Sequence, residues 1–255
     1  MELLVARNLG KIYNTKRGMR QCVALHDVNF TVEEGEFVAV MGPSGSGKTT
    51  LLNLLASLDK PSSGEILLDG KSFADIKEKN LSEFRRKHLG FVFQDFNLLD
   101  TFTLKDNILL PLVLSKTPVE EMEQRIVPVT ELLRIEKLLD KYPYEVSGGE
   151  KQRAAVARAV ITNPRLLLAD EPTGALDSRA SRELLENFTQ LNRSGKTVVM
   201  VTHSAYAASF AGRVMLIRDG SIFSQLYRGE ADNRAFFDRI VANLSLLTDG
   251  GADLA

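Results

Sequence analysis

Short runs of aliphatic and β-branched residues, separated by polar turns, recur along most of this chain. Runs of this length and composition predict β-strands. They cover residues 3–6, 23–32, 37–41, 65–68, 91–93, 166–169, 198–202 and 214–217. The runs at 37–41, 166–169 and 198–202 are almost continuously apolar, as in strands buried on both faces of a parallel sheet. Turn-forming residues at 33–35 and 69–70 separate the early runs, so an antiparallel sheet is expected beside the parallel one.

The pattern changes between residues 95 and 159, where strand-like runs give way to helical periodicity. One helical set of apolar positions comprises Ile126, Val129, Leu132, Leu133 and Ile135. We therefore predict an α/β core with an antiparallel β subdomain from residues 1–94 and 160–228, and a helical subdomain inserted at 95–159. Residues 229–255 are expected to form an amphipathic helix and a tail.

The C-terminal helix is expected to place six apolar residues on one face. They are Phe236, Phe237, Ile240, Val241, Leu244 and Leu247. Packing of this face on the chain's own core is the interpretation we favour, and a partner interface is the alternative. Residues 250–253 beyond the helix are expected to be disordered.

Composition excludes several classes of protein. The 255 residues are 44% hydrophobic and 25% charged with a net charge of −1, which gives no support for nucleic-acid binding. The single cysteine, Cys22, excludes an intramolecular disulfide and fits a reducing compartment. No apolar run approaches the roughly 20 residues of a membrane-spanning helix. Any role at a membrane is therefore expected to come through a partner.

A glycine-rich segment directly after the 37–41 run matches the phosphate-binding loop pattern without a mismatch. It reads Gly42, Pro43, Ser44, Gly45, Ser46, Gly47, Lys48 and Thr49, and Thr50 follows it. Glycines let backbone N–H groups approach phosphates, Lys48 neutralises phosphate oxygens, and Thr49 offers a hydroxyl to Mg²⁺. The segment predicts an ATP- and magnesium-binding site on a P-loop NTPase (RecA-like) core, with Gly42 to Thr50 as nucleotide-binding residues.

Two further strand ends carry chemistry suited to ATP hydrolysis. Asp170 and Glu171 end the run at 166–169, where Asp170 can hold Mg²⁺ and Glu171 can orient or deprotonate a water. His203 follows the run at 198–202. The carboxyl ends of parallel strands form the edge where such sheets bind ligands, so His203 is expected to contact the γ-phosphate.

A second glycine-rich element, Ser147-Gly148-Gly149, opens a predicted helix about a hundred residues after the phosphate loop. We expect its backbone N–H groups to be free and, with the helix dipole, to bind an anion. A simple kinase or GTPase needs no second phosphate-binding surface, so the presence of a second such element is a clue to the function.

These motifs together resemble the ATP-binding-cassette (ABC) transporter ATPases over nearly the whole chain. The segment from Ser147 to Arg153 resembles that family's signature motif, Gln94 its Q-loop, and 174–177 its D-loop, which ends at Asp177. The resemblance implies that Gln94 contacts Mg²⁺ and the attacking water, and that His203 is the switch histidine. It also implies that Tyr13 stacks on adenine.

The resemblance further implies a dimer and a membrane partner. In the family two subunits pack head to tail, and each signature motif covers the γ-phosphate held by the other subunit's phosphate loop. The chain is thus expected to dimerise on ATP and to drive an integral-membrane permease from the cytoplasmic face of the membrane. The apolar cluster Phe96, Leu98, Leu99 and Phe102 is then either part of the helical core or a groove for the permease.

Within the family the chain is most similar to the macrolide-export and lipoprotein-release group, and in that group to bacitracin-resistance (Bce-type) ATPases. Segments 91–99, 107–112, 170–177 and 201–204 and the pair Phe236-Phe237 carry this similarity. It implies a role in resistance to antimicrobial peptides, and a link through the permease to a sensor kinase stays open. Glu150-Lys151 replaces a commoner Gln-Gln in the signature.

Two alternatives remain open at this point. A cassette ATPase of nucleic-acid repair or translation would carry a long coiled-coil insertion or a second cassette, and this chain has neither. A nucleotide sensor with little turnover would not need Glu171 and His203. Macrolide-export or lipoprotein-release transport is the nearer alternative to peptide resistance.

Overall fold

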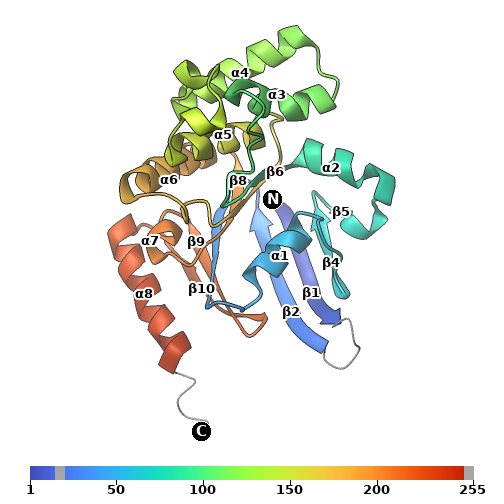
Figure 1. Cartoon of the computed structure of the whole chain (residues 1–255). Coiled ribbons are helices and arrows are strands. Elements are labelled where there is room, and N and C mark those ends of the chain that lie inside the picture. Colours follow the sequence, from blue (N-terminus) through green and yellow to red (C-terminus); the bar gives the residue numbers. More distant parts are fainter. Residues whose placement is uncertain (15–20, 250–255) are drawn as a thin grey trace. The chain divides into compact units, whose positions relative to one another are not determined.

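The computed structural model describes residues 1–14 and 21–249, with side chains described as far as Ser245. The chain forms two compact units (Figure 1). The first unit comprises Met1–Lys77 and Val199–Ala255, and the second comprises Glu78–Val198. The predicted subdomain boundaries stay a prediction, and the second unit contains the whole predicted helical range 95–159.

The first unit contains the antiparallel sheet that the sequence predicts. Its strand order is β2-β1-β4-β5. The strands are β1 (Glu2–Asn14), β2 (Gln21–Glu33), β4 (Ser63–Leu68) and β5 (Lys71–Ser72). β1 is longer than predicted because its residues after Ala6 mix exposed and buried positions and include polar side chains, so they lack a continuous apolar pattern. β5 has only two residues, too few to give any pattern.

The first unit also holds strands in the order β10-β9-β3-β8. They are β3 (Phe37–Met41), β8 (Thr197–Val201, which enters the unit at Val199), β9 (Arg213–Arg218) and β10 (Ser221–Tyr227). All residues of β3 are buried, as the continuous apolar run predicts, and β3 pairs with β9 in parallel. β10 was not predicted because it is an antiparallel strand of alternating, half-exposed residues.

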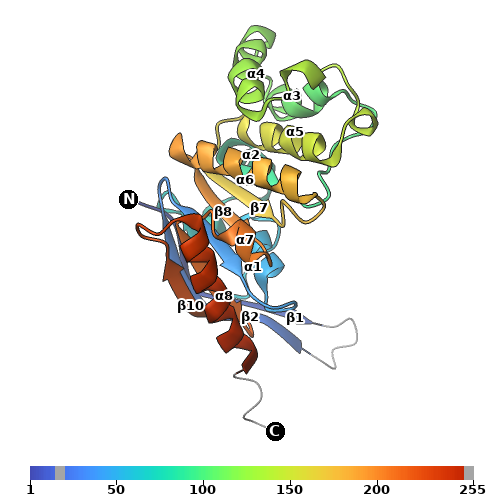
Figure 2. The same ribbon diagram turned by 90° about the vertical axis from the view of Figure 1, so that its left-hand side faces the viewer.

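Three helices belong to the first unit: α1 (Lys48–Leu55), α7 (Ala205–Ala208) and α8 (Asn233–Asp249). The aliphatic residues of α1 are buried. α8 packs beside α7 and buries Phe236 and Ile240 completely, so its apolar face serves the chain's own core, while Val241 is exposed (Figure 2). The predicted face residue Leu247 and the predicted disorder at 250–253 lie outside the described side chains.

The second unit contains two parallel strands and most of the helices. Its strands are β6 (Leu89–Val92) and β7 (Leu166–Asp170). Its α-helices are α2 (Leu81–His88), α3 (Leu104–Leu114), α4 (Val119–Leu133), α5 (Gly148–Val160) and α6 (Ser178–Arg193). The predicted absence of strands between 95 and 159 is confirmed. Short 3₁₀ turns occur at Phe73–Asp75 in the first unit and at Glu78–Asn80, Glu136–Leu138 and Pro143–Glu145 in the second.

Local sequence explains where the functional helices begin. Asp177 caps α6, and that helix buries Leu184, Leu185, Phe188 and Leu191 at helical spacing. Ser147 caps α5, whose middle is an almost unbroken run of buried alanine and valine. In the described part of the chain, no helix combines the length and the apolar character needed to cross a membrane.

Candidate functional site

The phosphate loop of the first unit lies between β3 and α1 and has the backbone geometry of an anion cradle. Gly45 and Gly47 have φ angles of 79° and 102°, in the left-handed region that favours glycine. Backbone in such conformations can turn successive N–H groups toward one point. A Cβ atom at Gly47 would lie 2.5 Å from the carbonyl oxygen of Ala24, so β2 leaves no room for a side chain there.

Lys48 is the first residue of α1 and folds back over this loop. Its Nζ donates to the carbonyl oxygens of Gly42 and Pro43, each at 2.9 Å. Thr49 and Thr50 follow in the first turn of α1, where the helix dipole favours an anion. The structure thus brings the predicted loop residues around one concave backbone segment with an ammonium group beside it.

Tyr13 lies on β1 of the same unit and is held by an ion pair. Its hydroxyl donates to Asp59 Oδ2 at 2.9 Å and interacts with the side chain of Thr50 on α1. Lys11 Nζ donates to Asp59 Oδ1 at 2.6 Å and lies 4.8 Å from the centre of the Tyr13 ring. Burial and the Asp59 carboxylate raise the pKa of Tyr13. The ring is therefore fixed next to α1 while 40% of the residue stays exposed.

We expect the replacement Asp59→Ala to weaken ATP binding without slowing the hydrolysis step. Loss of the carboxylate frees Tyr13, and a stacked aromatic pair contributes about 0.5–1.5 kcal/mol, so the KM for ATP should rise by at most about tenfold. Steady-state kinetics measures this, with Glu65→Ala as the control because Glu65 makes an exposed ion pair with Arg7 on the same sheet. A KM equal to that of the control would contradict the assignment.

The same variant has a predictable pH dependence. Burial raises the pKa of Asp59, but hydrogen bonds from Lys11, Tyr13 and the Lys60 N–H outweigh it and lower the pKa overall. A lowered folded-state pKa contributes stability that is present above the unfolded pKa and is lost as pH falls through the folded value. The difference in Tm between wild type and Asp59→Ala should therefore shrink in acid.

His203 is the second residue after β8, and the structure places it in the unit that holds the phosphate loop. The N–H of Thr202 donates to the carbonyl oxygen of Val40 at 3.1 Å, next to the point where β3 leads into Gly42. His203 is exposed at this end of the sheet. The arrangement agrees with the expected γ-phosphate contact, which stays a prediction.

The second unit brings Gln94 and the two acidic residues to one end of its strands. β6 and β7 are parallel with Val92 opposite Ala169, so the chain segments that follow them leave the sheet together. Asp170 ends β7, and Glu171 has a φ of 44° before Pro172. The carbonyl oxygen of Glu171 accepts from the N–H of Gly174 at 2.9 Å. This turn fixes Glu171 immediately beyond the strand.

Gln94 reaches the same turn. A Cβ atom at Gly174 would lie 3.1 Å from Nε2 of Gln94, so the Gln94 side chain lies against the backbone of that glycine. The predicted metal-binding side chains are one hydroxyl (Thr49), one amide (Gln94) and one carboxylate (Asp170). Mg²⁺ bound mainly by substrate phosphates takes few protein ligands of this kind, so the donor set fits it. Among the described residues no cluster of three or more His, Cys, Asp or Glu suggests a dedicated metal cage.

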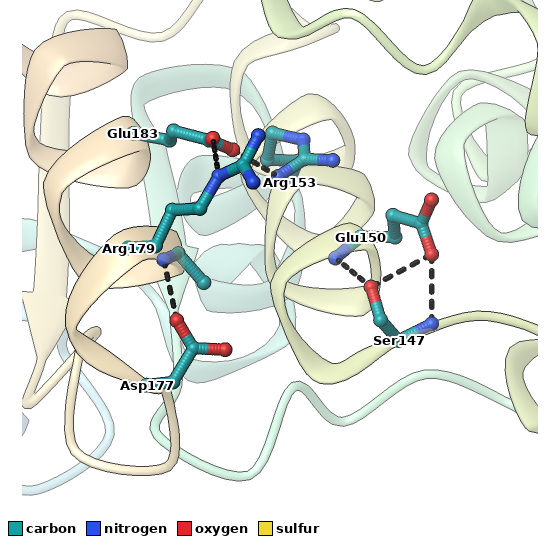
Figure 3. Close-up of polar contacts among 7 residues, drawn as sticks. Ser147, Glu150, Arg153, Asp177, Arg179 and Glu183 are labelled. Atoms are coloured by element: carbon teal, nitrogen blue, oxygen red, sulfur yellow. Dashed lines mark hydrogen bonds and ion pairs between the residues drawn. The ribbon is translucent and has the colours of Figure 1, made fainter.

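The signature segment corrects one expectation. Ser147 and Glu150 form a reciprocal capping box at the start of α5 (Figure 3). The N–H and hydroxyl of Ser147 donate to Glu150 Oε2 at 2.8 and 2.7 Å. The prediction of a free Ser147 N–H group is therefore wrong, because the carboxylate of Glu150, three residues later, already accepts its hydrogen bond. These hydrogen bonds, the one from the Ser147 hydroxyl first, lower the pKa of Glu150.

The helix start still leaves two donors available. The N–H groups of Gly148 and Gly149 make none of the hydrogen bonds found for the described residues. A Cβ atom at Gly149 would lie 2.9 Å from Cβ of Ala180 on α6, so a side chain there would force α5 and α6 apart. The two glycines therefore combine free donors with close helix packing.

A hollow of about 280 Å³ joins the signature segment to the D-loop. Its lining includes Ser147, Gly148, Gly149 and Asp177. The Asp177 carboxylate accepts from the Ala180 N–H at 2.8 Å and thereby caps α6 (Figure 3). Beside it, Glu183 accepts from Arg179 at 3.1 Å and from Arg153 at 3.5 Å. The lining of this polar hollow contains two guanidinium groups, of Arg153 and Arg179, and two carboxylates, of Asp177 and Glu183, so its charges balance.

Sequence reasoning missed three residues of these sites. The Ser147–Glu150 pair was visible in the sequence, because Ser-x-x-Glu is the pattern of a capping box. Asp59 could not be found, since it lies 46 residues from Tyr13. Gln152 lies within the predicted signature segment, but nothing in the sequence signals its contacts with the Gln94 and Glu171 segments.

Comparison with known proteins identifies the family. Residues 25–174 match the family described as "ABC transporter". The chain belongs to the ABC transporter family. Its predicted fold class, a P-loop NTPase with an antiparallel sheet and a helical part, is confirmed, and as a member of the family it is an ATPase that uses ATP.

Individual relatives cover almost the whole chain. The bacitracin export ATP-binding protein BceA of Halalkalibacterium halodurans is 48% identical over 97% of each chain. The uncharacterized ABC transporter ATP-binding protein YvcR of Bacillus subtilis is 50% identical over 97% of this chain and 95% of its own. The dimeric structure of the cassette MJ0796 from Methanocaldococcus jannaschii has a TM-score of 0.80 and 39% identity, covering 88% of this chain and 98% of that one. MJ0796 is also known as a dimer bound to ADP and Pi after hydrolysis.

Proposed function

We propose that this ABC ATPase drives a membrane permease that protects a bacterium against bacitracin-like antimicrobial peptides. The observation that carries the transport mechanism is the presence of two anion-binding elements, the phosphate loop and the Gly148–Gly149 helix start. A nucleotide bound to one chain needs only that chain's phosphate loop. The Gly148–Gly149 helix start then finds its ligand in the γ-phosphate of the nucleotide that a second copy of the chain binds. Similarity to BceA over 97% of both chains supports the peptide-resistance assignment.

The proposal assigns the nucleotide-binding steps to the first unit. The N–H groups of the loop from Gly42 to Thr49 and the ammonium group of Lys48 bind the phosphates, and Tyr13 stacks on the base. His203 donates to the γ-phosphate. When bound, Mg²⁺ neutralises charge on the β- and γ-phosphates, with Thr49, Gln94 and Asp170 as its protein ligands.

The hydrolytic step is assigned to the second unit. Glu171 takes the proton of the attacking water, and the amide of Gln94 orients that water. The N–H groups of Gly148 and Gly149 bind the γ-phosphate held by a second copy, and Ser147 and Asp177 line the same hollow beside them. Closure of two copies on ATP and their release after hydrolysis then supply the work of transport.

The permease is the membrane partner in this proposal, and it holds the chain at the cytoplasmic face of the membrane. The segment after Gln94 offers a contact surface, because Leu99 and Phe102 are 44% and 38% exposed despite their apolar character. A sensor kinase that reads the state of the transporter through the permease is part of the same proposal. Nucleic acid is not a partner.

A resistance assay tests the proposed substrate class. We expect the strain that carries Glu171→Gln in place of the wild-type gene to become as sensitive to bacitracin as a strain without the gene, with unchanged sensitivity to macrolides. Glu136→Gln, an exposed acid away from every motif, is the matched control and should keep full resistance. Sensitivity to macrolides instead would favour macrolide export, and unchanged sensitivity to both would refute the peptide-resistance assignment.

A further inference from the structure

Gln152 is a completely buried polar residue in a helix whose other buried positions are almost all small and apolar. It lies in α5, five residues after Ser147, and none of its surface is exposed. Its buried neighbours along the helix are Ala154, Ala155, Val156, Ala157, Ala159 and Val160. Burying an amide among such residues is unfavourable unless its hydrogen-bonding groups find partners. The partners of Gln152 therefore indicate why a glutamine stands there.

The amide nitrogen of Gln152 joins two segments that are far apart in the sequence. Nε2 donates to the carbonyl oxygen of Phe93 at 3.0 Å and to that of Pro172 at 2.9 Å. Both partners are acceptors, so only the nitrogen of the amide can face them. One side chain of the signature helix thus uses both of its N–H donors on two separate loops.

Each of these carbonyl groups is next to a residue of the proposed hydrolytic machinery. Phe93 directly precedes Gln94, and Pro172 directly follows Glu171. Pro172 is also inside the turn in which the N–H of Gly174 donates to the carbonyl oxygen of Glu171. The Gln94 side chain lies against Gly174 in that turn. A displacement of Gln152 would therefore move the backbone on which both Gln94 and Glu171 are mounted.

The same helix holds the Gln94 segment at a second point. Arg158, six residues after Gln152, donates to the carbonyl oxygens of Phe96, at 2.9 Å, and of Asn97. Phe96 has a φ angle of 60°, which is unfavourable for an aromatic residue and needs support from its surroundings, and Asn97 follows with a φ of 50°, which asparagine tolerates. Side chains of α5 therefore hydrogen-bond to the backbone on both sides of Gln94, at Phe93 before it and at Phe96 and Asn97 after it.

We propose that Gln152 is a positioning residue that couples the signature helix to the catalytic groups Gln94 and Glu171. When Gly148 and Gly149 at the start of α5 bind the phosphate of a second copy, Gln152 transmits the resulting position of the helix to both groups at once. This proposal rests on the proposed function of Gln94, Glu171 and the signature. It assigns Gln152 no contact with nucleotide, so its effect falls on turnover and not on nucleotide binding.

The variant Gln152→Met tests the proposal, because methionine fills a similar volume and cannot donate to the two carbonyls. In the full-length chain we expect kcat for ATP to fall by about tenfold while KM stays within about twofold of wild type. Thr130→Val is the control. It also replaces a buried polar side chain of the second unit by an apolar one, and Thr130 bonds only to its own helix at Ile126 and Val127. A normal kcat in Gln152→Met, or an equal fall in Thr130→Val, would overturn the proposal.

A double-mutant cycle separates positioning from general damage to the fold. If Gln152 acts through Gln94, the effect of Gln152→Met on kcat should shrink to about threefold or less in a Gln94→Ala background. The same tenfold loss in both backgrounds would show that Gln152 does not act through Gln94 and would refute the proposed coupling to both groups. Failure of the proposed function is recognised separately, because Glu171→Gln would then retain turnover in the same assay.

Discussion

Replacement of Glu171 by glutamine is expected to reduce ATP turnover by about 10²–10⁴-fold, the range that a positioned general base contributes. Glutamine preserves the size of the side chain and the turn in which Gly174 donates to the residue-171 carbonyl, but it cannot accept the proton of the attacking water. ATP binding should survive, since the phosphate loop is untouched. Purified Glu171→Gln should therefore form a dimer in the presence of ATP that persists where the wild-type dimer dissociates.

Phosphate release and size-exclusion chromatography with and without ATP measure both consequences. Glu136→Gln changes an exposed acid in the same unit and should behave as wild type in both assays. Turnover at the wild-type level in Glu171→Gln would remove Glu171 as the base. A loss of turnover without an ATP-dependent dimer would leave the base in place and argue against the head-to-tail mechanism.

The replacement Gly47→Ala is expected to weaken ATP binding by on the order of 100-fold, because the loss of a hydrogen bond to a charged phosphate costs about 1.5–3 kcal/mol. A Cβ atom at this position would lie 2.5 Å from the Ala24 carbonyl oxygen, and the φ of 102° is itself unfavourable for alanine. The loop must therefore shift away from β2, and its N–H groups leave the positions that bind phosphate. Equilibrium titration with a fluorescent ATP analogue measures the change.

Gly35→Ala is the matched control for the Gly47→Ala titration. Gly35 has a φ of 76° in a turn before β3, and no atom lies within 4 Å of the Cβ position. The variant therefore introduces backbone strain without a collision and outside the phosphate loop. It should lower Tm and leave ATP affinity unchanged. An equal loss of affinity in the two variants would mean that instability, and not loop geometry, is responsible.

The parts of the fold and site that the sequence predicts are those encoded by neighbouring residues. The apolar run of β3 and the glycines that follow it are continuous in the chain, so the phosphate loop could be predicted with its flanking strand and helix. The same holds for Asp170 at the end of β7 and for Glu171 after it. β10 could not be predicted because a half-exposed strand needs only alternate apolar residues, a pattern that loops share.

The contacts that fix side-chain orientation depend on residues distant in the sequence. Asp59 meets Tyr13 only because β1 pairs with β4 and the loop before β4 carries the acid. Gln152 meets Phe93 and Pro172 only when α5 packs on the ends of two strands. No local pattern signals either contact. The capping box at Ser147 is the opposite case, since its pattern was local but the anion-binding interpretation of the same residues obscured it.

That capping box has a consequence for discrimination among anions. The Glu150 carboxylate already accepts hydrogen bonds from the hydroxyl and N–H of Ser147, so it takes the place that the oxygen of an anionic ligand would have. A visiting anion must outcompete a singly charged group that is tethered three residues away and therefore present at high effective concentration. Under the proposed function we therefore expect an anion of higher charge that also contacts Gly148 and Gly149 to bind here in preference to a singly charged solute. The capping box is thus expected to make the start of α5 selective for multiply charged anions.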